Sequence, residues 1–131
     1  MEIKTHNPTE WLQHFGLNHG VEVRNAERTL YLSGQTATNA EGQIMHAGML
    51  VEQYALAWKN LLDALKAADM DAGNLVRLNL YTTDVAQFME KAEAIVSHHM
   101  EAGANISCTL LEVAALFDPD AMIEIEATAV A

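Results

Sequence analysis

Three side-chain types in this chain could do chemistry: the carboxylate of Glu124, the single thiol, Cys108, and the hydroxyl of Ser33. A carboxylate can orient a water molecule and take its proton, whereas a thiol becomes a strong nucleophile when a histidine or a helix N-terminus lowers its pKa. Ser33 is followed by Gly34 and Gln35 and lacks the Gly-x-Ser-x-Gly elbow. We therefore interpret Ser33 as a hydrogen-bonding group where a strand ends.

Glu124 belongs to a stretch from Met122 to Val130 in which apolar and polar residues alternate. This period of two predicts a strand with one face in a core, so the face that carries Glu124 and Glu126 must meet water, a partner subunit or a ligand. The functional interpretation is that Glu124 holds a water molecule or forms a polar pocket wall, with Glu126 structural. The alternative is a surface or interface carboxylate satisfied by Arg77.

Cys108 lies on the alternating run of Ile106, Cys108 and Leu110. A buried cysteine that acts as a small apolar residue is the commonest outcome at such a position. The alternative is a thiol that lines a pocket. His14 and His19 lie in a segment that could approach it, but no sequence spacing places either of them beside Cys108.

The histidines do not form a metal-binding pattern. The six histidines include no H-x-H or H-E-x-x-H spacing, and the adjacent His98 and His99 point about 100° apart on a helix. The glycines form no phosphate loop. The sequence therefore predicts no metal and no cofactor, and we interpret Tyr54 and Trp58, at helical spacing, as packing residues.

Composition limits the class of protein. The 131 residues fit one domain, 1–131. The formal charge of −11 repels phosphate backbones and anionic lipid, which predicts no nucleic-acid partner and no membrane partner. One cysteine allows no internal disulfide, no apolar run reaches about 18 residues, and no signal peptide is apparent. A cytoplasmic location is therefore expected.

The elements follow from periodicity and turn residues. Two short strands around a polar turn at 24–27, with Asn25 left-handed, predict a hairpin, and apolar spacing predicts two helices. The predicted elements are strands near 21–23 and 29–33, a helix near 47–68, a strand at 75–81, a helix near 85–102, strands at 107–113 and 122–130, and an extra strand at 2–5. This order predicts an α+β fold with a mixed sheet of five or six strands and two helices packed on one face.

Two helices cover only one face of such a sheet, so the other face needs a role. It carries charged and bulky side chains: Glu124, Glu126 and Thr128 on the last strand, and Arg77, Asn79 and Tyr81 on the middle strand. This mixture suits a wet subunit interface, and an ordinary solvated face remains the alternative.

Four segments occur in a characteristic order: L-Y-L-S-G-Q-T at 30–36, W-K-N-L-L-D-A-L at 58–65, N-L-Y-T-T-D at 79–84 and M-I-E-I-E-A-T-A at 122–129. Over nearly the whole chain this order resembles the RidA (YjgF-type) family. The resemblance implies a chorismate-mutase-like α+β fold, a homotrimer with a central barrel, and ligand clefts between neighbouring subunits.

The resemblance also implies an activity, which is metal-free and cofactor-free hydrolysis of reactive enamines and imines to a keto acid and ammonia. In that family an arginine binds the substrate carboxylate bidentately, and a glutamate on the last strand holds the attacking water. By alignment Cys108, followed by Thr109, takes the arginine's position, Glu124 matches the glutamate, and Ser33 and Gly34 match the start of a serine-glycine-glutamine motif.

Three positions depart from the family pattern. Cys108 has neither the charge nor the donors of an arginine, Leu17 takes the place of a tyrosine, and Ala92 that of an asparagine. Each lost charge-assisted contact is worth about 1.5–3 kcal/mol, which weakens binding of 2-imino acids.

The sequence thus predicts a RidA-like enamine or imine hydrolase that acts on a different substrate. Glu124 would be catalytic, and Ser33, Gly34, Leu17, Ala92, Cys108 and Thr109 would line the site. A non-catalytic trimer that binds a small molecule or a protein is the alternative, and cysteine-dependent chemistry or redox sensing is a third.

Overall fold

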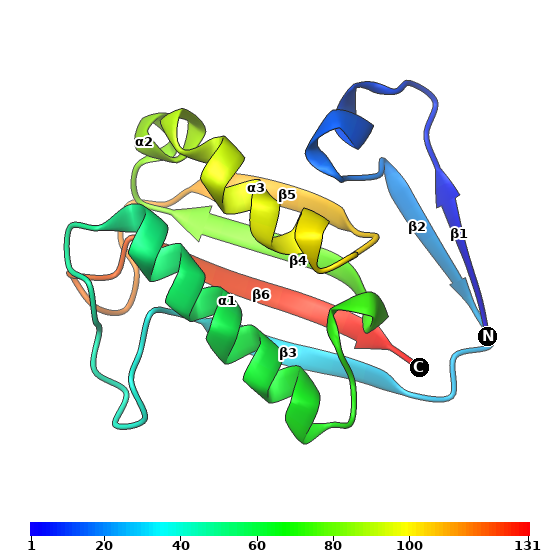
Figure 1. Ribbon diagram of the computed structural model, residues 1–131, viewed down its shortest axis with the longest axis horizontal. Coiled ribbons are helices and arrows are strands. Elements are labelled where there is room, and N and C mark those ends of the chain that lie inside the picture. Colours follow the sequence, from blue (N-terminus) through cyan, green and yellow to red (C-terminus); the bar gives the residue numbers. More distant parts are fainter.

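Six strands and three helices make up the computed structural model, which describes residues 1–131 (Figure 1). Four strands form a mixed sheet in the order β3-β6-β4-β5, in which only the β4–β5 pair is parallel. Two more strands form a separate antiparallel pair, β1-β2. The strands are β1 Glu2–His6, β2 Gly20–Arg24, β3 Thr29–Gln35, β4 Leu75–Thr82, β5 Ser107–Glu112 and β6 Ile123–Val130.

The helices lie together on one face of the four-stranded sheet, where α1 and α3 are neighbours (Figure 1). They are α1 Leu50–Ala67, α2 Val85–Glu90 and α3 Ala92–Glu101, with short 3-10 turns η1 at Trp11–Phe15 and η2 at Ala72–Asn74. None of the helices combines the length and the apolar character that a membrane span requires. The α+β class, with a mixed sheet covered by helices on one face, is therefore confirmed.

The predicted hairpin is wrong. Asn25 has the expected left-handed backbone, with φ of 57°, but β2 pairs with β1 and β3 pairs with β6. The turn therefore joins two sheets, and one sheet of five or six strands becomes a four-stranded sheet and a two-stranded one. A strand's own sequence pattern states which face is apolar but not which strand will pair with it.

The predicted second helix is two helices. Asp84 caps α2 as expected, because its side chain accepts a hydrogen bond from the Gln87 backbone N–H at 3.0 Å. The chain then breaks at Lys91, whose backbone lies outside the helical region, and Ala92 begins α3. The break re-aims the chain, so that α3 packs against α1.

The core lies between the helices and the sheet. Ile123, Ile125, Ala127 and Ala129 of β6 are all buried, which confirms the predicted inward face of that strand. The packing role predicted for Tyr54 and Trp58 is also confirmed, because both belong to this core.

The opposite face of the sheet is open and polar. Glu126 accepts hydrogen bonds from Asn79 Nδ2 and from the Tyr81 hydroxyl, both at 2.8 Å. Arg77 donates to the Thr109 hydroxyl oxygen at 2.5 Å, from β4 to β5. Side chains of three adjacent strands are therefore linked to one another across this face.

Gln53 of α1 is a buried polar residue that holds the start of β6. Its side-chain oxygen accepts from the Met122 backbone N–H at 2.8 Å, and its Nε2 donates to the Asp120 carbonyl at 2.7 Å. Nε2 also donates to the Met45 carbonyl at 3.2 Å. The residue just before Ile123 is thus fixed by α1.

We expect Gln53→Leu to lower the free energy of unfolding by about 1–3 kcal/mol, because it leaves three part-buried backbone groups without the Gln53 side chain as partner. Urea denaturation at one fixed protein concentration measures the difference. Glu52→Gln, on the exposed side of the same helix turn, is the control and should change stability by less than about 0.5 kcal/mol. A Gln53→Leu protein as stable as the control would contradict this role.

Candidate functional site

The residues predicted to form the site separate into two groups in the folded chain. The first group consists of Ser33, Gly34 and Glu124. It lies where β3 and β6 meet. The pairing of these strands shifts register between Leu32 and Gln35, so Ser33 and Gly34 occupy an irregular, exposed stretch.

Gly34 and Glu124 are in close contact. A Cβ atom built at Gly34 would lie 2.6 Å from Oε1 of Glu124, 2.7 Å from Cδ and 2.8 Å from Cγ. Any residue other than glycine would therefore displace the carboxylate. Two residues that the family resemblance assigns to one site are therefore neighbours in the folded chain.

The two carboxylates of β6 have opposite pKa shifts. Burial, followed by the charge of Glu126, raises the pKa of Glu124 above its ordinary value. Hydrogen bonds from Tyr81 and Asn79 lower the pKa of Glu126. A carboxylate with a raised pKa is the better proton acceptor of the two, which favours Glu124 for proton transfer.

Arg77 does not satisfy Glu124. Its guanidinium donates to Thr109 and to the Ser107 hydroxyl at 3.5 Å, and no ion pair joins it to either carboxylate of β6. The interpretation of Glu124 as a carboxylate neutralised by Arg77 is therefore wrong.

The second group, Leu17, Ala92 and Cys108, lines one cavity of about 330 Å³, which we call the apolar cavity. These are the three positions that depart from the family pattern, and the fold brings them together. The whole lining is Trp11, Leu12, Phe15, Leu17, Leu80, Phe88, Met89, Ala92, Val96, His99, Cys108 and Leu110. It draws on η1, α2, α3 and the strands β4 and β5.

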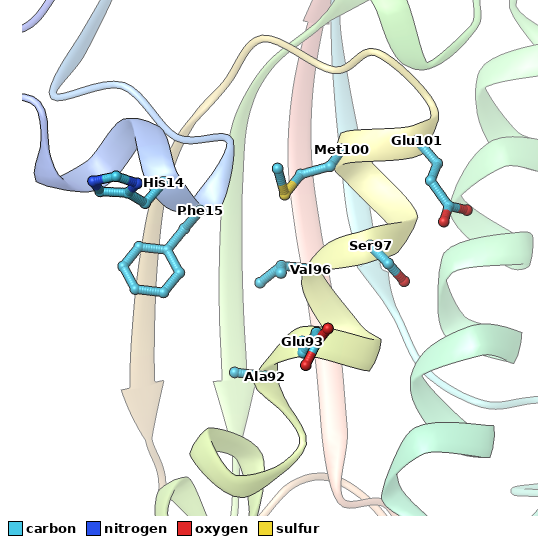
Figure 2. A pocket seen from close by; sticks show the side chains of 8 residues that line it. All are labelled: His14, Phe15, Ala92, Glu93, Val96, Ser97, Met100 and Glu101. Carbon is cyan, nitrogen blue, oxygen red and sulfur yellow. The ribbon is translucent and has the colours of Figure 1, made fainter.

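A second hollow of about 500 Å³ opens beside the apolar cavity, between η1 and α3, and shares Phe15, Ala92 and Val96 with it. Figure 2 shows Val96 and Met100 of α3 pointing across this gap toward η1, which carries His14 and Phe15. The sequence analysis placed His14 in a segment that could approach Cys108, but it predicted neither the short helix η1 nor the role of its apolar residues in a cavity. The helical spacing of its apolar residues Trp11, Leu12 and Phe15 is the sequence signal that could have indicated this helix.

His99 is a cavity residue that the sequence analysis missed. It is buried, and its Nε2 donates to the Phe15 carbonyl at 2.8 Å, which ties α3 to η1. Burial lowers its pKa below the ordinary value for histidine, so His99 is uncharged at neutral pH. It therefore offers the cavity no positive charge.

Cys108 is half-buried and lines the apolar cavity, and it also packs against the core. Cys108 is thus in part a packing residue and in part a thiol that lines a pocket. Burial raises the pKa of its thiol to about 11, and the charge of Arg77 has a smaller, opposite effect. An un-ionised thiol is a poor nucleophile, which disfavours cysteine-dependent chemistry.

We expect iodoacetamide to alkylate Cys108 about 100-fold more slowly in the folded protein than in urea at pH 8, because the thiolate is correspondingly rarer. The folded-state rate should rise about tenfold per pH unit between pH 7 and 9, since the pKa lies above that range. Mass spectrometry of quenched samples measures both rates. Equal rates in the two states would show an ordinary thiol and contradict the raised pKa.

The two groups cannot meet on one small ligand within a single chain. Cys108 is in register with Leu78, which is in register with Ala127, and all three point toward the helices. Glu124 lies three residues from Ala127, which is about 10 Å along the strand, and an odd separation places it on the opposite face. Thr109 also lies on the opposite face, bonded to Arg77, so it does not line the apolar cavity.

No three His, Cys, Asp or Glu side chains are grouped so that they could hold a metal ion. Glu124, whose pKa is raised, can do acid–base chemistry, and the apolar cavity lies on the other face of the sheet. The protein is thus of the α+β class, with helices on one face of a mixed sheet, the apolar cavity on that same side and Glu124 on the open face.

Comparison with known proteins identifies the class. Residues 16–131 match the family model described as Endoribonuclease L-PSP. The chain is 34% identical over 105 residues to a 2-iminobutanoate/2-iminopropanoate deaminase of Mus musculus. The aligned residues cover 79% of this chain and 75% of the mouse protein.

Solved structures agree with the sequence match. A Yersinia pestis protein, YyfB, described as a protein of unknown function of the conserved Rid family, superimposes with a TM-score of 0.87 at 30% identity over 100% of both chains. The YjgF gene product of E. coli has a TM-score of 0.69 at 26% identity, over 86% of each chain. The chain belongs to the RidA (YjgF-type) family.

Proposed function

We propose that the chain assembles as a homotrimer, with the open sheet faces forming a central barrel and ligand clefts at the subunit boundaries. Large side chains on the open face support this assembly: Tyr31 is 80% exposed and Leu111 is 51% exposed. Exposed aromatic and aliphatic groups among polar ones are typical of subunit interfaces. A cleft between copies would let Glu124 of one chain approach the apolar cavity of the next.

In this cleft the protein hydrolyses imines or enamines without a metal or cofactor. The observation that carries the proposal is the pairing of Gly34 with Glu124, a carboxylate whose pKa is raised and whose position depends on a glycine. Ser33 adds a hydroxyl beside them. The names of the mammalian relatives, 2-iminobutanoate/2-iminopropanoate deaminases, support the same chemistry.

The reaction needs one water molecule and proton transfers. The substrate reacts in its N-protonated form, and Glu124 takes a proton from the water as the water oxygen bonds to the imine carbon, which gives a neutral carbinolamine. Glu124 then delivers that proton to nitrogen. The C–N bond breaks as Glu124 accepts the hydroxyl proton and the carbonyl forms, and ammonia leaves and takes that proton from Glu124 as ammonium. Positioning supplies the rest, because the C=N bond is already electrophilic.

The substrate differs from the usual 2-imino acids, because the residue at the position of the carboxylate-binding arginine is an un-ionised thiol. RNA is disfavoured as well. Although the family model's description names an endoribonuclease, a net charge of −11 repels a phosphate backbone. The cytoplasmic location remains a prediction.

Ammonia release from a panel of freshly generated imines and enamines, with and without 2-carboxylates, tests the proposal. We expect a rate above the uncatalysed one for some members of the panel, and a trimer mass in sedimentation equilibrium. Background rates for every compound would contradict the hydrolase. A stable monomer at micromolar concentration would contradict the shared cleft.

The alternative function is a non-catalytic trimer that binds a small molecule or a protein. The absence of a cation from the apolar cavity favours it, because a binding pocket needs only apolar burial. Ligand binding with no turnover of any compound in the panel would support this alternative.

A further inference from the structure

We propose that the apolar cavity binds the uncharged aryl or branched alkyl substituent of the substrate, which makes the substrate class imines of apolar primary amines without a carboxylate. This inference rests on the proposed function for the chemical step and on the cavity alone for the binding step. The two steps can be measured separately.

The size and lining of the cavity fit such a group. Its volume is about 330 Å³, and His99 is the only lining residue that is not hydrophobic. A dry apolar cavity of roughly 150 Å³ already holds benzene, so this one accommodates a phenyl ring together with a short alkyl chain. Ligand pockets begin at about 300 Å³.

The charges around the cavity exclude a carboxylate. No lysine or arginine lines it, His99 is uncharged because burial lowers its pKa and its Nε2 is engaged by Phe15, and Cys108 offers a neutral thiol. A carboxylate buried there would have no counter-charge, which is costly. The net charge of −11 opposes anions further.

The rim of the cavity carries exposed apolar side chains that could contact an apolar ligand. Trp11 is 59% exposed, Met89 55% and Phe15 39%, and all three line the cavity. These groups are large and apolar, and they come from two separate elements, η1 and α2. A bound ring would remove their exposed surface from water, which favours binding.

The chemistry of these imines also indicates which class of reaction must supply them. An imine that lacks a carboxylate arises when a primary amine loses two hydrogen atoms to an oxidant, as in amine dehydrogenation. Hydrolysis then converts R₂C=NH and water into R₂C=O and ammonia, with no net oxidation. The substrate would therefore come from an amine-oxidising reaction.

Phenylacetone and phenylpyruvate provide a matched pair of probes, because the second carries the carboxylate that the first lacks. Isothermal titration calorimetry measures their binding as product analogues, independently of turnover. We expect phenylacetone to bind about tenfold or more tightly than phenylpyruvate. Equal affinities, or tighter binding of phenylpyruvate, would overturn the inference.

Two variants at the cavity and one control sharpen the test. Cys108→Arg should reverse the preference, because it supplies a cation where the thiol lies. Ala92→Leu should fill the cavity and weaken phenylacetone at least about tenfold, whereas Ala94→Leu, on an exposed position of α3 outside the cavity, should not. Circular dichroism shows whether each cavity variant is folded. If one of the two is not, the binding measured with the other tests the inference.

Two further outcomes separate this inference from the proposed function. Selective binding of phenylacetone without ammonia release from any imine would support the cavity and contradict the hydrolase. Ammonia release from imines of apolar amines, with no preference over 2-imino acids, would support the hydrolase and overturn the cavity's role. Failure of both ketones to bind would overturn the cavity's role too.

Discussion

Replacement of Glu124 by glutamine is expected to lower kcat for imine hydrolysis by about 10²–10⁴-fold, the range that general acid–base groups contribute. The amide has nearly the same shape but cannot accept the proton of water. Ammonia release measured by a coupled assay on the best substrate of the panel gives the rate. An E124Q enzyme within about threefold of the parent rate would remove Glu124 from the chemistry.

The pH profile adds a second readout. Glu124 acts as a base only when ionised, so kcat/KM should fall as the pH drops through its pKa. Because burial and the charge of Glu126 raise that pKa, the acid limb should lie above the ordinary range for glutamate, about 4.3. A limb at or below that value would contradict the raised pKa.

Glu126→Gln is the matched control on the same strand face. Its plateau rate should stay close to that of the parent, because Glu126 is held by Asn79 and Tyr81 and takes no part in the site. Its acid limb should move to lower pH, since loss of the neighbouring negative charge makes Glu124 easier to ionise. A plateau loss as large as that of Glu124→Gln would show that the two carboxylates are not distinct in role.

Gly34→Ala is expected to reduce kcat about 100-fold while it leaves the fold intact. The new methyl group would overlap the Glu124 side chain, whose Oε1, Cδ and Cγ all lie within 2.8 Å of the added Cβ. The carboxylate must shift by about 1 Å or more, and a displacement of that size at a reacting group can cost about 10²-fold. Alanine also reduces the entropy of the unfolded chain, so stability should change by less than about 1 kcal/mol.

Steady-state kinetics together with urea denaturation test this pair of expectations. Gly20→Ala is the control, because its added Cβ has only one ordinary contact, 3.8 Å from the His6 side chain. It should keep the parent rate. If Gly34→Ala retained full activity, the contact with Glu124 would have no part in placing the carboxylate.

Local patterns in the sequence determined the elements that carry the site. The alternation from Ile123 to Val130, the apolar stripe of α1, the Asp84 cap and the left-handed Asn25 are each set by neighbours within a few residues, so they can be inferred without knowledge of the rest of the chain. The grouping of Gly34 with Glu124 followed from the family motifs, and the structure places the two in contact.

Only the tertiary structure decided which strands pair, that β2 belongs with β1, and that α2 and α3 separate at Lys91. It also decided that Leu17, Ala92 and Cys108 share a cavity with His99 and Trp11, while Glu124 lies about 10 Å further along the sheet on its other face. Strand pairing and cavity walls depend on contacts between residues far apart in the chain, whose energies a local pattern does not contain. The sequence therefore indicated the candidate site residues, and the fold determined that a single chain holds them in two separate groups.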